Sequence, residues 1–198
     1  MLKAVGIAGS PRREGNSTTL LKALLAGAAE AGAAGQIFHL NDLAFRGCQA
    51  CEPCTPDDTC RIEDDLTEVL AALRAADIWA LAAPIYFDGV SGQMKLFFDR
   101  CRHLTNEAGK LRKMLTGRRA AAVIITYEDK QRDDYRDVAR RLVNYLGWMG
   151  QFDPIEVVDG AKLGPAGAAA GRPELLARAR GIGRKLTGQL GGSAPAGA

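Results

Sequence analysis

The sequence predicts a doubly wound α/β domain, in which five parallel strands in the order 2-1-3-4-5 form a sheet with helices on both faces. Strand-like apolar runs alternate along the chain with stretches whose apolar residues recur at helical spacing. The 198 residues are enough to bury the core of one such domain without cross-links. Hydrophobic residues make up 47% and charged residues 25%, which excludes a disordered or fibrous protein.

The first half of the chain is expected to contain two strands and two helices. Lys3–Ala8 is a short apolar run that ends at a glycine, which is typical of a strand. A helix with leucines at helical spacing begins at Ser17 and ends at one of the two glycines that follow. Gln36–Leu40 is the second strand, and after a cysteine-rich loop a second helix begins near Glu63.

The centre of the sheet is expected in the second half of the chain. Asp77–Ala83 is apolar on both faces, which is typical of a central parallel strand. The helix after it carries Cys101 on its apolar face, so this cysteine is predicted to be a small core residue. Arg119–Thr126 is the fourth strand, and a helix that ends at Gly147 or Gly150 follows it.

The last strand and the C-terminal segment complete the predicted chain. Gln151–Val158 contains Pro154, which cannot donate a hydrogen bond within a sheet, so this strand is expected at the sheet edge. We assign residues 1–159 to a flavodoxin-like domain, with a cysteine loop at residues 48–60. Residues 160–198 are interpreted as a linker, a last helix and a disordered tail.

Charge and hydropathy exclude two classes of partner. The 26 basic and 23 acidic residues leave a net charge of +3, which is too small to indicate nucleic-acid binding. The longest apolar run, Ile78–Ile85, is far shorter than the roughly 20 residues that span a bilayer. Because no secretory signal is visible, we expect a cytoplasmic protein whose thiols stay reduced.

The loop after the first strand has the composition of a phosphate site. It reads Gly9-Ser10-Pro11-Arg12-Arg13-Glu14-Gly15-Asn16-Ser17-Thr18-Thr19. Several hydroxyl groups can donate hydrogen bonds, Arg12 supplies positive charge, and free amides are expected at the helix N-terminus. A helix N-cap needs one such polar residue, whereas this loop contains several. The motif is neither a dinucleotide fingerprint nor a P-loop, so we interpret it as a different kind of phosphate-binding loop.

A second loop, after the third strand, is expected to face the first. It reads Ala83-Pro84-Ile85-Tyr86-Phe87-Asp88-Gly89-Val90-Ser91-Gly92-Gln93-Met94-Lys95. In the predicted order the first and third strands are neighbours where the sheet reverses direction, and ligands bind at that point. A phosphate loop on one side and an aromatic, apolar loop on the other indicate a mononucleotide with a flat ring.

These two motifs resemble those of the flavodoxin-like NADPH-dependent FMN reductase superfamily, over roughly residues 3–158. The resemblance implies that FMN is the cofactor. The phosphate of FMN would then be held by Ser10, Arg12, Asn16, Ser17 and Thr18. The isoalloxazine ring would be lined by Pro84, Ile85, Tyr86 and Phe87, and Ser91 would cap the next helix. A third flavin loop would contain Thr126 and Tyr127.

Four of the five cysteines lie within 13 residues: Cys48, Cys51, Cys54 and Cys60. Their spacing, C-x2-C-x2-C-x5-C, can wrap a cubane cluster and is more compact than the paired motifs typical of structural zinc. On this fold the spacing resembles the iron–sulfur flavoproteins, which implies that the four cysteines bind a [4Fe–4S] cluster. A zinc ion, or free or disulfide-bonded thiols, remain alternatives.

The resemblance implies an FMN-dependent oxidoreductase that passes electrons between NAD(P)H or a ferredoxin-like donor, FMN and the cluster. We assign no catalytic side chain, because the chemistry belongs to the cofactor. A homodimer or homotetramer is implied, and the basic stretch from Lys110 to Arg119 is a candidate docking site for an acidic carrier. Two alternatives stay open: an NAD(P)H-dependent FMN or quinone reductase without a cluster, and a non-enzymatic zinc- or thiol-based interaction module.

Overall fold

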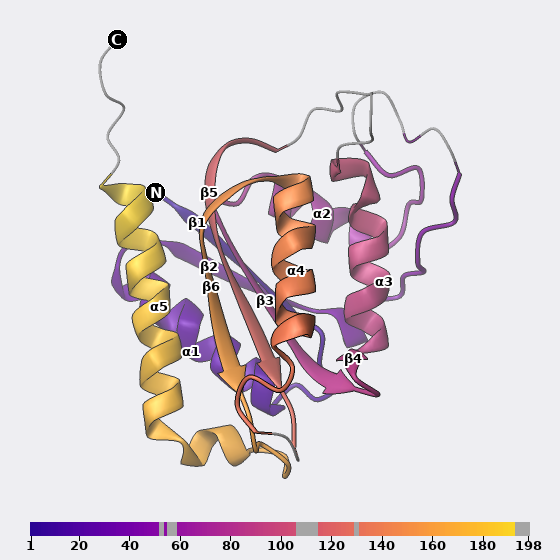
Figure 1. The fold of residues 1–198 in the computed structure, drawn as a ribbon. Coiled ribbons are helices and arrows are strands. Elements are labelled where there is room, and N and C mark those ends of the chain that lie inside the picture. The colour runs from indigo at the N-terminus through magenta and orange to yellow at the C-terminus, as the bar shows by residue number, and fades with distance from the viewer. Residues whose placement is uncertain (52–53, 55–58, 106–114, 129–130, 193–198) are drawn as a thin grey trace.

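The computed structural model describes residues 1–51, 54, 59–105, 115–128 and 131–192. Within these ranges the protein has three layers, because a twisted sheet lies between helices on both of its faces (Figure 1). The α/β class and the doubly wound parallel sheet that the sequence predicts are confirmed.

The strands pair in the predicted order. Their bounds are β1 Lys3–Ala8, β2 Ala34–His39, β3 Ile78–Tyr86, β4 Gly89–Val90, β5 Leu115–Thr126 and β6 Gly150–Gly160. The parallel path is β2-β1-β3-β5-β6, and β4 is a short strand that pairs antiparallel with the end of β3. With β4 set aside, this path is the order 2-1-3-4-5. The strand that contains Pro154, β6, lies at the edge of the sheet, as expected.

Two groups of helices bury the two faces of the sheet. Their bounds are α1 Asn16–Glu30, α2 Leu66–Arg74, α3 Gly92–Arg100, α4 Arg136–Met149 and α5 Pro173–Gly191. Short 3-10 helices cover Leu40–Asp42, Cys101–Leu104 and Ala168–Gly171. In Figure 1, α1 and α5 cover one face, and α2, α3 and α4 cover the other. Trp79 and Leu81 of β3 belong to the core on the α2–α4 side, whereas Ile78 and Ala80 belong to the core on the other side, which confirms a central strand apolar on both faces.

The contact between α1 and α5 depends on two glycines. A Cβ atom on Gly27 would lie 1.9 Å from the carbonyl oxygen of Arg180, and one on Gly183 would lie 1.9 Å from that of Leu24. The two helix backbones therefore touch, and a larger side chain at either glycine would force them apart. Through this contact the C-terminal helix packs onto the same core as α1.

Several element bounds differ from the sequence prediction for local reasons. β3 extends to Tyr86, because its last two residues pair with β4 in a short hairpin that the apolar pattern does not reveal. α3 ends at Arg100 and continues as a 3-10 helix through Leu104. β5 begins at Leu115, four residues before its predicted start, and its register with β6 shifts before Ala121.

Other expectations concern single residues or segments outside the described ranges. Cys101 is fully buried, as predicted, and burial raises the pKa of its thiol. No helix in the described part of the chain is long and apolar enough to cross a membrane. Residues 193–198 of the tail that was predicted to be disordered, and residues 110–114 of the basic stretch, lie outside the described residues.

Candidate functional site

A cavity of about 220 Å³ opens at the carboxyl ends of β1, β3 and β5. It lies where the strand order reverses, so the two loops that were expected to face each other do meet. Nine of the twelve predicted cofactor residues line it: Ser10, Arg12, Asn16, Ser17, Pro84, Ile85, Tyr86, Thr126 and Tyr127. Thr18, Phe87 and Ser91 lie nearby without lining it.

The loop between β1 and α1 is shaped by hydrogen bonds within itself. The Ser10 hydroxyl accepts a bond from the Arg12 amide at 3.1 Å, and the Gly15 amide donates to the Arg12 carbonyl at 3.0 Å. The buried Thr18 hydroxyl donates to the same carbonyl at 3.4 Å. A Cβ atom on Gly15 would lie 2.6 Å from the Ser10 hydroxyl oxygen, so the closed loop requires glycine there. The Arg12 side chain remains exposed beside the cavity.

The N-terminus of α1 has the features of an anion-binding site. Its N-cap residue is Gly15, and no side-chain hydrogen bond caps the helix within the described residues. The Ser17 hydroxyl is buried, lines the cavity, and has no hydrogen-bond partner among the residues that the structure describes. Buried hydroxyls are almost always hydrogen-bonded. An uncapped helix end with such a hydroxyl therefore fits an acceptor bound in the cavity, and the interpretation of the loop as a plain N-cap is not supported.

Asn16 connects the loop to a distant part of the chain. Its Nδ2 donates to the carbonyl oxygens of Leu163 at 2.7 Å and Pro165 at 3.0 Å. Its Oδ1 accepts a bond from the Ala169 amide at 3.0 Å. Because these bonds engage the side-chain amide, Asn16 holds the segment between β6 and α5 against the cavity.

The end of β3 forms the opposite wall. Pro84, Ile85 and Tyr86 line the cavity, whereas Phe87 at the tip of the β3–β4 hairpin is fully exposed. Ser91 occupies the N-cap position of α3, but its hydroxyl does not cap the helix, which corrects the expected role. The structure instead ties this loop to the first one through Ser91, as its hydroxyl donates to the Gly9 carbonyl at 2.6 Å.

The end of β5 and the residues after it form the third wall, which contains Thr126 and Tyr127. The Tyr127 hydroxyl donates to the Asp159 carboxylate at 2.5 Å. The Tyr127 ring packs edge-on against the ring of Tyr135, with the two centroids 4.9 Å apart. The Tyr135 hydroxyl in turn donates to Asp88 at 2.5 Å, which joins this wall to the β3–β4 hairpin. Burial and the Asp159 carboxylate raise the pKa of Tyr127 well above its usual range, so the phenol stays protonated.

Sequence reasoning missed four residues that line the cavity: Gly15, Glu128, Leu163 and Gly164. Glu128 directly follows Tyr127, so extending the third loop by one residue would have included it. A Cβ atom on Gly164 would lie 2.6 Å from a carboxylate oxygen of Glu128, which explains the glycine. The segment that we interpreted as a linker thus contributes to the rim of the cavity.

The chemistry of this cavity fits FMN. Arg12, the N-terminus of α1 and the Ser17 hydroxyl supply positive charge and donors suited to a phosphate. The wall at Pro84–Tyr86 supplies apolar surface suited to a flat ring.

The four clustered cysteines border a second, smaller cavity of about 20 Å³. All four thiols are free; Cys51 is exposed, and Cys48, Cys54 and Cys60 are half-buried. Over the described ranges, no three or more Cys, His, Asp or Glu side chains are close enough together to hold a metal ion. The four cysteines supply the donor type that iron–sulfur clusters use, and all four border this one cavity.

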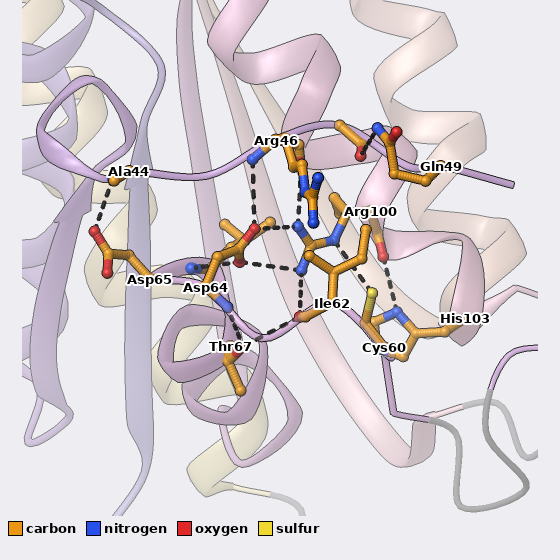
Figure 2. A network of polar contacts seen from close by, with 12 residues as sticks. Ala44, Arg46, Gln49, Cys60, Ile62, Asp64, Asp65, Thr67, Arg100 and His103 are labelled. Carbon is orange, nitrogen blue, oxygen red and sulfur yellow. Dashed lines mark hydrogen bonds and ion pairs between the residues drawn. The ribbon is translucent and has the colours of Figure 1, made fainter. Parts of the chain in front are cut away.

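The cysteine cavity has basic residues on its inner side. Arg100, Arg102 and His103 line it together with the cysteines. Figure 2 shows two contacts of Arg100 at this cavity: its Nε donates to the Cys60 sulfur at 3.2 Å, and its carbonyl accepts a bond from the His103 Nδ1 at 2.8 Å. The end of α3 therefore contacts Cys60 directly.

Comparison with known proteins identifies relatives over most of the chain. Residues 2–154 match the sequence profile of the NADPH-dependent FMN reductase family. An iron–sulfur flavoprotein of Methanocaldococcus jannaschii is 33% identical over 187 residues, which cover 93% of this chain and 95% of that protein.

Solved structures share the fold. The structure of RosB with bound 8-demethyl-8-formylriboflavin-5'-phosphate has a TM-score of 0.72 at 17% identity, and the match covers 98% of this chain and 81% of that one. An NAD(P)H:quinone oxidoreductase from Methanothermobacter marburgensis has a TM-score of 0.70 at 19% identity, over 93% of this chain and 98% of that one. These matches confirm the flavodoxin-like fold. The chain therefore belongs to the NADPH-dependent FMN reductase family and is an FMN-dependent oxidoreductase.

Proposed function

We propose that this protein is an electron-transfer flavoprotein with two redox groups. FMN binds in the cavity between β1, β3 and β5, and a [4Fe–4S] cluster binds to Cys48, Cys51, Cys54 and Cys60. Electrons pass between NAD(P)H or a ferredoxin-like donor, FMN and the cluster. The observation that carries the FMN site is the buried, unpartnered Ser17 hydroxyl at the uncapped N-terminus of α1, evaluated over the described residues.

The protein's own residues bind and orient the flavin. When bound, FMN supplies the redox chemistry, because it exchanges a hydride with a nicotinamide or single electrons with a carrier. Arg12 and Ser17 hold the phosphate by charge and hydrogen bonding. The wall at Pro84–Tyr86 packs against the ring and keeps water from that face. The Tyr127 hydroxyl is committed to Asp159, so we assign it to the wall of the site and not to proton transfer.

The cluster is supported by the donor type and by a relative. Four thiols border one cavity, and thiolates are the usual ligands of [4Fe–4S] clusters, which exchange single electrons. The similar protein from Methanocaldococcus jannaschii is named an iron–sulfur flavoprotein, and its match covers 93% of this chain. We therefore favour a cluster over zinc or free thiols.

We further propose that the protein acts as a homodimer or homotetramer. One helix, α3, connects the two cavities within a chain: Ser91 at its start contacts the first flavin loop, and Arg100 at its end contacts Cys60. Nine helical residues span roughly 13 Å. The resemblance implies that a second copy brings the cysteine segment of one chain near the flavin of another.

The proposal is tested by the absorption spectrum and by the iron, sulfide and zinc contents of protein purified without oxygen. We expect flavin absorption bands on a broad iron–sulfur background, with iron and acid-labile sulfide in equal amounts. Flavin without iron would favour an NAD(P)H-dependent FMN or quinone reductase that lacks a cluster. Zinc without flavin would favour an interaction module and contradict the proposal.

A pair of cysteine variants tests the ligand assignment. Cys54→Ser should lose iron and retain FMN, because it removes a ligand and leaves the flavin cavity intact. Cys101→Ala is the control, since this cysteine is buried in the core and is not one of the predicted ligands, and it should retain both groups. Unchanged iron in Cys54→Ser would show that Cys54 is not a ligand.

A further inference from the structure

Arg100, the last residue of α3, is a buried cation with every N–H engaged. Its side chain is 0% exposed. Nε donates to the Cys60 sulfur at 3.2 Å. Nη1 donates to the Arg46 carbonyl at 2.9 Å and to Asp64 Oδ2 at 2.6 Å. Nη2 donates to the Ile62 carbonyl at 3.0 Å and to Asp64 Oδ1 at 3.1 Å (Figure 2).

The acceptors of these bonds come from both ends of the cysteine segment. Arg46 precedes the first cysteine, and Ile62 and Asp64 follow the last one. The Arg46 amide also donates to Asp64 at 3.4 Å, so the two ends are joined directly as well. One guanidinium therefore holds together the two ends of the cysteine segment, residues 46 and 62–64, which we call its base. The planar fork is held at both Nη atoms, which directs the Nε–H toward Cys60.

The sulfur contact has a consequence beyond packing. A hydrogen bond from a charged donor is stronger than one from a neutral donor, and it favours negative charge on the acceptor. Hydrogen bonds to ligand sulfurs and nearby charge are among the factors that set the reduction potential of iron–sulfur clusters. Reduction adds one negative charge, so a buried cation at a ligand sulfur stabilises the reduced form and raises the potential.

We propose that Arg100 is a positioning residue for Cys60, which fixes this sulfur at the base of the cysteine segment and raises the reduction potential of the cluster through its N–H···S contact. This inference rests on the proposed cluster. The second part of the inference is that Arg100 holds the two ends of the cysteine segment together. This part involves protein atoms alone and can be measured without a cluster.

The experiment compares three variants with the wild type. Arg100→Gln removes the charge, and Arg100→Lys keeps the charge but lacks the planar fork. Lys95→Gln is the matched control, because it removes a positive charge from the exposed face of the same helix, where Lys95 pairs with Asp99 at 2.7 Å. The measurements are iron and sulfide content, the midpoint potential from an anaerobic titration followed by electron paramagnetic resonance, and folding by circular dichroism.

We expect a more negative potential in Arg100→Gln than in the wild type, a smaller shift in Arg100→Lys, and no shift in Lys95→Gln. In cluster-free protein, hydrogen exchange of the amides in residues 44–48 and 60–66 should be faster in both Arg100 variants and unchanged in Lys95→Gln. If Arg100→Gln does not fold, Arg100→Lys provides the comparison.

The outcomes separate this inference from the proposed function. Potentials that match the wild type in both Arg100 variants, with full iron content, would overturn the inference and leave the cluster in place. A wild-type protein without iron and sulfide would overturn the proposed cluster, and the role in setting its potential with it. Unchanged hydrogen exchange in the Arg100 variants would show that Arg100 does not close the segment.

Discussion

The buried hydroxyl of Ser91 donates a hydrogen bond to the carbonyl oxygen of Gly9 at 2.6 Å. Ser91 directly precedes α3 and Gly9 directly follows β1, so this bond joins the two loops that border the proposed FMN cavity. A Cβ atom on Gly9 would lie 2.9 Å from the Cβ atom of Met94 in α3, so the loops meet without room for a side chain. The width of the cavity therefore depends on this contact.

Removal of the Ser91 hydroxyl should affect both stability and flavin binding. Ser91→Ala leaves the Gly9 carbonyl without this donor, and a lost buried hydrogen bond costs about 1–3 kcal/mol in the free energy of unfolding. FMN affinity should fall as well, because the two loops are no longer held together. Urea unfolding and fluorescence titration with FMN measure the two effects. An unfolding free energy equal to that of the wild type would rule out the structural role.

Ser17 offers a matched comparison, because its hydroxyl is equally buried but has no partner among the described residues. Ser17→Ala should leave the stability of the flavin-free protein unchanged or slightly higher, since it removes an unsatisfied polar group. FMN affinity should nevertheless fall by about 1–2 kcal/mol, because the variant loses a hydrogen bond to the phosphate. The same two measurements as for Ser91 apply. Equal FMN affinity in Ser17→Ala and wild type would exclude this hydroxyl from the site.

Arg12 should discriminate FMN from riboflavin. Arg12→Ala should weaken FMN binding by about 1.5–3 kcal/mol through loss of a charged hydrogen bond, and should leave riboflavin binding unchanged, since riboflavin has no phosphate. Arg13→Ala is the control, because the Arg13 side chain is exposed and pairs with Asp42 at 2.6 Å outside the cavity. Dissociation constants for both flavins measure the effect. An equal loss of FMN affinity in both variants would indicate a general effect of charge and not a contact to phosphate.

The parts of the site that were predictable from the sequence are those encoded by local patterns. Ser10 lies two residues after the apolar run that ends at Ala8, and Pro84 directly follows the predicted strand Asp77–Ala83. The parallel order places the ends of these two strands together. Leu163 reaches the cavity through a bond to Asn16, which is 147 residues away in the sequence. No periodicity or motif encodes such a contact, so the segment resembled a linker.

The cysteine segment likewise combines features that local sequence patterns predict with a long-range contact that they do not. The spacing of the four cysteines predicts ligands, because the residues that matter are close together in the sequence. Arg100 is 40 residues from Cys60 and sits on a helix whose apolar pattern assigns it no special role. A buried arginine at that position becomes visible only when the segment and the helix end are seen in contact. Ser91 is a similar case: its place at the start of α3 was predicted, but the acceptor of its hydroxyl was not.

Asp64 should contribute to stability in a pH-dependent way through its pair with Arg100. Burial tends to raise the pKa of Asp64, but hydrogen bonds from Arg100 and from the Arg46 and Leu66 amides outweigh it and lower the pKa from its usual value. A carboxylate whose pKa is lower in the folded state stabilises the protein above the pKa of the unfolded chain, roughly pH 4. That contribution is lost as the pH falls through the folded-state value.

Asp64→Asn should therefore lower the free energy of unfolding by about 3–5 kcal/mol at pH 7, because it leaves a buried guanidinium without its carboxylate. The difference from the wild type should stay constant down to about pH 4 and narrow below it, as protonation removes the same charge from the wild type. Urea unfolding at a series of pH values measures this difference. Asp65→Asn is the control, because Asp65 is exposed and accepts a bond from the Ala44 amide at 2.7 Å, and its effect should be much smaller. A gap between Asp64→Asn and wild type that does not narrow in acid would show that the ionised Asp64–Arg100 pair is not what stabilises the base of the cysteine segment.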